Sequence, residues 1–177
     1  MTELKRYACI HSEKPATLTF TKPSAGEIVS GLRFTGAVNF TYAAQNDDPY
    51  KLYWQKSTST GALTVESGNL HFVNDNSWGG TNIFLKGGSL VVSSIQTNPF
   101  SAVTQTGRAN ADLFISGDAV LELGADVTAA VRCLQVNGEW LRRGEYTASA
   151  NNPWLKGLGK LHVRKDSPKP GITLILR

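Results

Sequence analysis

The sequence predicts an all-β protein, and three observations carry that prediction. Apolar and polar residues alternate in short runs along most of the chain, as in ATLTFT at 16–21 and KLHVR at 160–164. A period of two belongs to a strand that packs one face on a core. Glycine is frequent, with 17 residues, and helical spacing is almost absent. One pattern of apolar residues also recurs along the chain, which predicts a parallel β-solenoid.

The recurring pattern has apolar residues separated by two, five and two positions, first at Leu63, Val65, Leu70 and Phe72 and then at Ile83, Leu85, Leu90 and Val92. A third copy, with one residue added near Gly117 and Asp118, has Leu113, Ile115, Leu121 and Leu123. A unit of this kind cannot bury its apolar face alone, so we expect each to lie over the next. Val65, Leu85 and Ile115 should then form one column. Gly68 and Gly88 should turn the chain between the two strands of each unit, where a positive φ favours glycine.

The repeats divide the chain into three parts of one structural domain. Residues 61–136 hold the repeats, and the polar stretch 94–110 is expected to be a loop that leaves one turn. Residues 1–60 fit the pattern poorly and are expected to form either an N-terminal β cap or divergent coils. Residues 137–177 are expected to close the other end, because a stack of strands must cover its terminal edges.

An antiparallel β-sandwich or jelly roll is the alternative fold, since it also has short alternating strands. Several features argue against it. The strands within a unit are only four residues apart, and few two-residue Asn-Gly turns occur. A sandwich also has no reason to repeat the same inward residues at matched positions.

Composition and charge limit the function classes. No apolar run reaches the eighteen residues or so of a membrane span. The first fourteen residues lack the apolar block of a signal peptide, so we expect an intracellular protein or a piece of a larger secreted chain. Residues 132–177 hold nine Lys or Arg against three acids. This basic end favours polyanions such as acidic glycans, although a solvated surface is the simpler interpretation, and no nucleic-acid motif accompanies it.

The two cysteines, Cys9 and Cys133, are expected to be buried, inert thiols. In a stack they belong to opposite ends, some 20 Å apart, and a disulfide tolerates less than about 7 Å between Cα atoms. We therefore predict no bridge between them.

Two segments resemble a known family. NSWGGTNIFLKGGSLVV at 76–92 resembles the autotransporter-associated β-strand repeat through Asn76, Gly80, Gly88, Leu90 and Val92. LQVNGEWLRRGEYTASANNPWLKGLGKLHV at 134–163 resembles the closing segment that follows such repeats in large bacterial surface proteins. Trp78 and Asn82 depart from the repeat, which usually has Tyr and Thr there. The resemblance covers about 60–163 and implies a right-handed solenoid, extracellular or on the cell surface, as an accessory part of a larger polypeptide.

Catalytic signals are weak. Asp47 and Asp48 stand together before Pro49, which indicates a turn and not the facing carboxylates of a glycosidase. His71 and His162 alternate with apolar residues, so both should point outward, and neither has partners at metal-ligand spacing. We expect no metal and no cofactor. A Gly-x-Ser-x-Gly nucleophile motif and a phosphate-binding loop are both absent from the sequence.

Binding is better supported, because aromatic faces on a rigid sheet hold sugar rings and neighbouring amides orient them. The candidate ligand-binding residues are Tyr50, Tyr53, Trp54, Asn74, Asp75, Asn76 and Trp78. For Trp78, and less strongly for the tyrosines and Trp54, packing inside the fold is the simpler interpretation. Trp140 and Trp154 are expected to cover the last coil.

The leading hypothesis is a non-catalytic extracellular β-solenoid domain of a larger bacterial protein, acting as spacer, adhesion or glycan-binding module. We expect a glycan as its partner, no nucleic acid and no insertion into a membrane. The alternative is a polysaccharide lyase or glycosidase on the same scaffold, marked by an outward cluster of acid, base and cation on adjacent strands. A third possibility is a structural protein that associates through the end of its stack.

Overall fold

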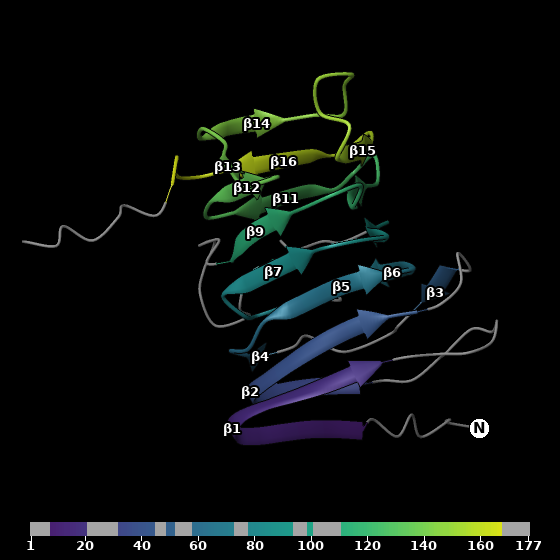
Figure 1. The fold of residues 1–177 in the computed structure, drawn as a ribbon, viewed down its shortest axis with the longest axis vertical. Coiled ribbons are helices and arrows are strands. Elements are labelled where there is room, and N and C mark those ends of the chain that lie inside the picture. The colour runs from purple at the N-terminus through teal and green to yellow at the C-terminus, as the bar shows by residue number, and fades with distance from the viewer. Residues whose placement is uncertain are drawn as a thin grey trace, which may run out of the picture.

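The computed structural model describes residues 8–20, 32–44, 49–51, 58–72, 78–93, 99–100 and 111–167, and every regular element in these ranges is a β-strand. The prediction of an all-β fold is therefore confirmed. Figure 1 shows the strands lying one above another along the long axis of the molecule, with β1 at one end and β14 at the other.

Three sheets contain all of the described strands. The first sheet has the order β1 (Ala8–Phe20), β2 (Leu32–Ala43), β5 (Leu63–Ser67), β7 (Asn82–Leu85), β9 (Asp112–Ile115), β12 (Leu134–Val136) and β13 (Glu139–Trp140), with β4 (Thr58–Ser59) also beside β2. The second has the order β15 (Leu155–Gly157), β10 (Val120–Leu123), β8 (Ser89–Val92), β6 (Asn69–Phe72) and β3 (Pro49–Lys51). The third has the order β11 (Thr128–Val131), β16 (Lys160–Val163) and β14 (Gly144–Tyr146).

Successive strands alternate between the first two sheets, and each pairs with the strand one repeat away. From β5 to β10 the chain enters the first sheet, then the second, three times over. All pairs between the strands of successive repeats are parallel. An antiparallel sandwich or jelly roll pairs its strands in the other sense, so the repeat region from β5 to β10 does not match that alternative.

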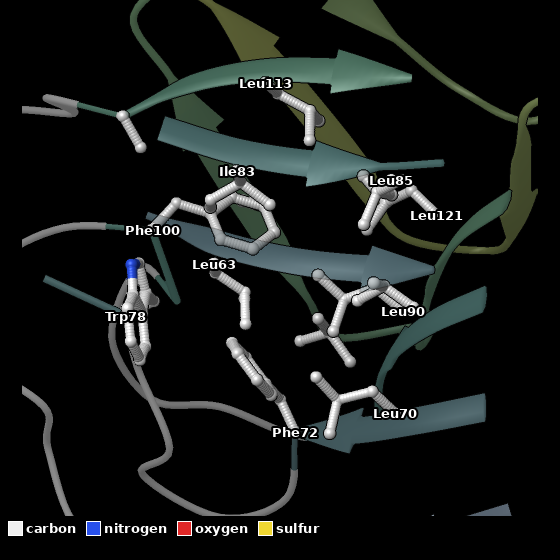
Figure 2. Close-up of a cluster of buried hydrophobic side chains, with 14 of the residues drawn as sticks. Leu63, Leu70, Phe72, Trp78, Ile83, Leu85, Leu90, Phe100, Leu113 and Leu121 are labelled. Atoms are coloured by element: carbon white, nitrogen blue, oxygen red, sulfur yellow. The ribbon is translucent and has the colours of Figure 1, made fainter. Parts of the chain in front are cut away.

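The predicted columns are present. Val65 is paired with Leu85, and Leu85 with Ile115. On the second sheet Leu70 is paired with Leu90, and Leu90 with Leu121. These residues are all buried, and Figure 2 shows members of both sheets meeting in one apolar interior. Repeats that follow one another in the sequence are therefore neighbours in each sheet.

Glycine makes the turn between the two strands of each repeat, as predicted. Gly68 has a φ of 74° and Gly88 a φ of 65°, in the left-handed region that glycine reaches without steric cost. A Cβ added at Gly88 would overlap the carbonyl oxygen of Gly68, so the two turns also lie directly over each other. Gly117 has the same φ of 65° in the third repeat.

The first sheet extends beyond the repeats toward the N-terminus. β2 is parallel to β5, with Phe40 paired with Leu63, and β1 is parallel to β2. Phe34, Phe40 and Tyr42 of β2 are fully or almost fully buried. The described part of residues 1–60 thus continues the stack, whereas Leu18 on the terminal strand β1 remains 37% exposed.

The closing segment departs from a purely parallel arrangement. The turn at Asn137 and Gly138, with φ of 49° and 86°, folds β13 back antiparallel to β12. Consecutive positive φ values at Asn-Gly are typical of a two-residue hairpin. Further along, β14 returns antiparallel to β16, which is itself parallel to β11. The sheets are therefore mixed at this end.

Candidate functional site

The structure describes the side chain of one of the seven predicted ligand-binding residues. Trp78 is fully buried, and its indole N–H donates to the carbonyl oxygen of Gly61 at 3.0 Å. Its ring packs against Phe34 and Phe40, with centroid distances of 5.8 and 6.5 Å. Figure 2 shows it inside the apolar cluster. A ring without an exposed face cannot hold a sugar, so the assignment of Trp78 to ligand binding is wrong, and the packing interpretation is right.

The other six predicted residues remain predictions. Tyr50 lies on β3, where the backbone pairs with Leu70, but its side chain lies outside the described part of the molecule. The remaining five also lie outside the described residues: Tyr53, Trp54, Asn74, Asp75 and Asn76.

A row of aromatic side chains lies on the outer surface of the first sheet, where the sequence analysis had not placed a site. Phe84 and Phe114 stack face to face with centroids 4.8 Å apart, and Trp140 meets Phe114 edge-on at 5.6 Å. Trp140 is 36% exposed and contacts this row from β13, the terminal strand of the first sheet. Because the phenyl faces are turned to each other, this row is better suited to packing than to sugar stacking.

The third sheet carries a charged hollow on its outer surface. β16 places Lys160 and His162 on one side, because alternate residues of a strand point the same way, while Leu161 and Val163 are buried. The hollow has a volume of about 630 Å³, is open to solvent, and is lined by side chains that include Thr128, Ala130, Arg143, Glu145, His162 and Arg164. We call these residues, together with Lys160, the charged hollow.

Pairing between strands brings the members of the charged hollow together. Glu145 on β14 lies opposite His162 on β16, and His162 lies opposite Ala130 on β11. Lys160 lies opposite Thr128. The small side chain of Ala130 beside His162 leaves room above the sheet.

Glu145 contacts both Lys160 and His162. Its Oε1 is 2.9 Å from the Lys160 ammonium nitrogen, and its Oε2 is 3.0 Å from His162 Nε2. The hydrogen bond from Lys160 is the main reason that the pKa of Glu145 is lowered, and His162 adds to the effect. All three side chains are at least 40% exposed, so water screens these interactions.

The two arginines of the hollow differ from Lys160 and His162, because neither forms an ion pair with Glu145. Arg143 directly precedes Gly144, which pairs with Val163, and Arg164 directly follows Val163. Both arginines therefore leave the same end of the β14–β16 pair. The carboxylate of Asp166 accepts a hydrogen bond from the backbone N–H of Arg143 at 2.8 Å. Among the described residues, no carboxylate forms an ion pair with either guanidinium.

A second charged group lies nearby but is structural. Asp112 is buried, and the Arg132 guanidinium donates to both of its carboxylate oxygens. Cys133 is buried beside this pair, and desolvation raises the pKa of its thiol. Within the described ranges no three His, Cys, Asp or Glu side chains gather as metal ligands.

The two thiols are free and lie far apart in the stack. Cys9 is on β1, Cys133 directly precedes β12, and four strands of the first sheet separate these two. Cys133 is buried as expected. The expectation for Cys9 is wrong, because the terminal strand leaves its side chain exposed.

The sequence had signalled part of the charged hollow. The alternation in KLHVR at 160–164 predicted an outward His162, which the structure confirms with a side chain 45% exposed. The position of Glu145 was missed, since nothing in its spacing indicates that β14 turns back against β16. The only available signal was an acid in a basic segment.

Comparison with known proteins gives no further assignment. No family model matches the chain, and no curated protein and no solved structure shows significant similarity to it. The described ranges also hold no helical segment with the length and hydropathy of a membrane span.

Proposed function

We propose that this chain is a non-catalytic β-solenoid domain that binds a glycan through the charged hollow. The observation that carries the proposal is the combination of a parallel stack of strands with a solvent-open hollow on its third sheet that gathers Arg143, Glu145, His162 and Arg164. The columns at Val65, Leu85 and Ile115 supply rigidity through continuous pairing. Rigid sheets position side chains without the ordering cost that a mobile loop pays on binding.

The finer features of the scaffold are part of the same proposal. The alternation of strands between two sheets supports a solenoid, and the resemblance of 76–92 and 134–163 to autotransporter-associated repeats supports a right-handed one. That resemblance also supports an extracellular or cell-surface location, as an accessory part of a larger bacterial polypeptide. A crystal structure that gave a left-handed winding would separate the chain from that family.

An array of purified glycans, probed with the full chain, tests the binding function. We expect a defined subset of the glycans to be bound, and binding to be lost when the hollow is altered by His162→Ala together with Lys160→Ala. Glu122→Ala with Lys156→Ala, a paired change on the second sheet, is the matched control. Glu122 and Lys156 face each other on β10 and β15 and line a different open hollow, so loss of binding in this pair alone would place the site there. If no glycan is bound, the spacer role replaces the binding role.

A lyase is the second candidate, because Glu145, His162 and Lys160 form an outward cluster of acid, base and cation on adjacent strands. Binding ranks first, since the cluster is exposed, and catalytic electrostatics gain their strength where water is excluded. A glycosidase has less support, because Glu145 is the one carboxylate among the described residues that line the hollow. Incubation with uronate polysaccharides, followed by ultraviolet absorbance of unsaturated products, tests the lyase. If the chain cleaves such a polysaccharide and His162→Ala abolishes the cleavage, catalysis would replace binding as the main function.

A further inference from the structure

We propose that the ligand of the charged hollow is an acidic polysaccharide, whose carboxylate or sulfate groups are bound by Arg143 and Arg164. This inference rests on the proposed function and names its ligand class.

The first argument is the distribution of charge. The hollow and its rim hold three permanent cations, Arg143, Lys160 and Arg164, against two carboxylates. Asp166 at the rim accepts a hydrogen bond from the backbone N–H of Arg143, and Glu145 lies in the hollow itself. The Glu145 carboxylate is already bound by Lys160 at 2.9 Å and by His162 at 3.0 Å. The two guanidinium groups have no carboxylate partner among the described residues. The surface therefore retains positive charge at one end of the hollow, which attracts an anion.

The second argument is the placement of the two arginines. They flank the paired residues Gly144 and Val163 on neighbouring strands, and neighbouring strands lie about 4.8 Å apart. Each guanidinium offers a planar fork of donors that matches a carboxylate or sulfate group. A nearby arginine, Arg132, is not part of this site, because its guanidinium already donates two hydrogen bonds to Asp112.

The third argument is shape. The hollow of about 630 Å³ is open to solvent and lies on one face of a three-stranded sheet. Small ligands are usually enclosed, with most of their surface buried, whereas an extended chain can lie across an open face and bind through several groups. The described lining residues include no Phe, Tyr or Trp ring on which a nucleic-acid base could stack. A glycan chain is thus favoured over a nucleic acid.

Isothermal titration of the full chain tests the ligand class with four probes. Heparin supplies sulfate groups, polygalacturonate supplies carboxylates, dextran is neutral, and single-stranded DNA is a polyanion without sugar acids. We expect saturable binding of heparin or polygalacturonate that weakens with added salt, and little binding of dextran or DNA. The tighter of the two acidic glycans identifies the anionic group.

Charge-removing variants locate the site. Arg143→Gln and Arg164→Gln should each lower the affinity for the acidic glycan about tenfold, the usual effect of losing one charge-assisted contact. Arg142→Gln removes the same charge from an exposed neighbour outside the lining of the hollow, and it should change the affinity less than about twofold by this reasoning. Thermal melts of all three variants verify folding.

The outcomes separate this inference from the proposed function. Equal losses for Arg142→Gln and the two hollow variants, or DNA bound as tightly as the glycan, would mean a general response to net charge and would overturn the inference. If the chain binds dextran and neither Arg143→Gln nor Arg164→Gln changes that binding, the proposal of glycan binding would stand. The proposal of an acidic ligand would then be wrong. Absence of binding to all three glycans would remove both.

Discussion

The guanidinium of Arg132 binds the buried carboxylate of Asp112 through two hydrogen bonds, from Nε to Oδ1 at 2.7 Å and from Nη2 to Oδ2. The hydrogen bond to Asp112 is also the main reason that the pKa of Arg132 is raised. The pair joins β9 to the bend before β12. Its two members differ in exposure, since the side chain of Asp112 is 5% exposed and that of Arg132 is 43% exposed.

This difference in exposure predicts that removing Arg132 and removing Asp112 lower the free energy of unfolding by unequal amounts. Arg132→Ala leaves a buried carboxylate without its cation and should lower the free energy of unfolding by about 3 kcal/mol. Asp112→Ala leaves an arginine that can turn to water, and should cost about 1 kcal/mol. Chemical denaturation measures both. Lys86→Ala, which breaks the exposed pair with Glu66 at 3.7 Å, is the control and should cost under about 1 kcal/mol. Equal costs for the two partners would contradict this account.

Two glycines with the same backbone angle should respond differently to alanine. Gly88 and Gly117 both have a φ of 65°. A Cβ at Gly88 would overlap the carbonyl of Gly68, whereas the nearest atom to a Cβ at Gly117 is the Lys86 carbonyl oxygen at 3.8 Å. Gly117→Ala should therefore cost only the backbone strain, about 1 kcal/mol. Gly88→Ala adds overpacking and should cost about 3 kcal/mol.

Thermal or denaturant unfolding compares the two glycine variants directly. Because φ is shared, the difference between them isolates the close approach of the stacked turns. A Gly88→Ala protein as stable as Gly117→Ala would show that successive turns are not in contact.

The repeats show how much of this fold is readable from sequence. The sequence predicts the column of Val65, Leu85 and Ile115 because a stack of identical pairings imposes the same apolar spacing on every unit. The strand pairing of the closing segment is harder to predict from the sequence. No comparable constraint fixes how β14 meets β16, so the approach of Glu145 to His162 could not be anticipated. For Trp78 the sequence already made packing the simpler interpretation, and its fully buried ring agrees with that interpretation.

The two thiols should differ in reactivity toward iodoacetamide. Cys9 is exposed, whereas Cys133 is buried and its pKa is raised by desolvation, which lowers the fraction of reactive thiolate. Mass spectrometry of the native protein should find the label on Cys9 and not on Cys133, and both should react after denaturation. Rapid native labelling of Cys133 would show that the bend before β12 opens readily.

The pairing of Glu145 with Lys160 should be visible in its titration. Lys160 lowers the pKa of Glu145 below the ordinary value of 4.5. A depressed folded-state pKa means that the pair contributes stability above about pH 4.5, and that this contribution is lost as the pH falls through the lowered pKa. Carbon-detected NMR of the Glu145 carboxyl measures the titration.

Lys160→Gln removes the main cause of the lowered pKa, so the pKa of Glu145 should rise toward its ordinary value. Lys156→Gln, on the second sheet, removes an equal charge at a distance from Glu145 and should leave its pKa unchanged. A Glu145 titration that is the same in all three proteins would contradict the ion pair.

The in-register pairing of β5, β7 and β9 makes the length of this molecule adjustable in discrete increments. Duplication of one unit of about twenty residues would insert a new layer into the stack. The new layer would make the same strand pairs above and below as the existing layers make. Each such event would move the carboxyl-terminal surface about 4.8 Å farther from the amino-terminal strand. Duplication of repeats can therefore set the distance between the charged hollow and the first strand.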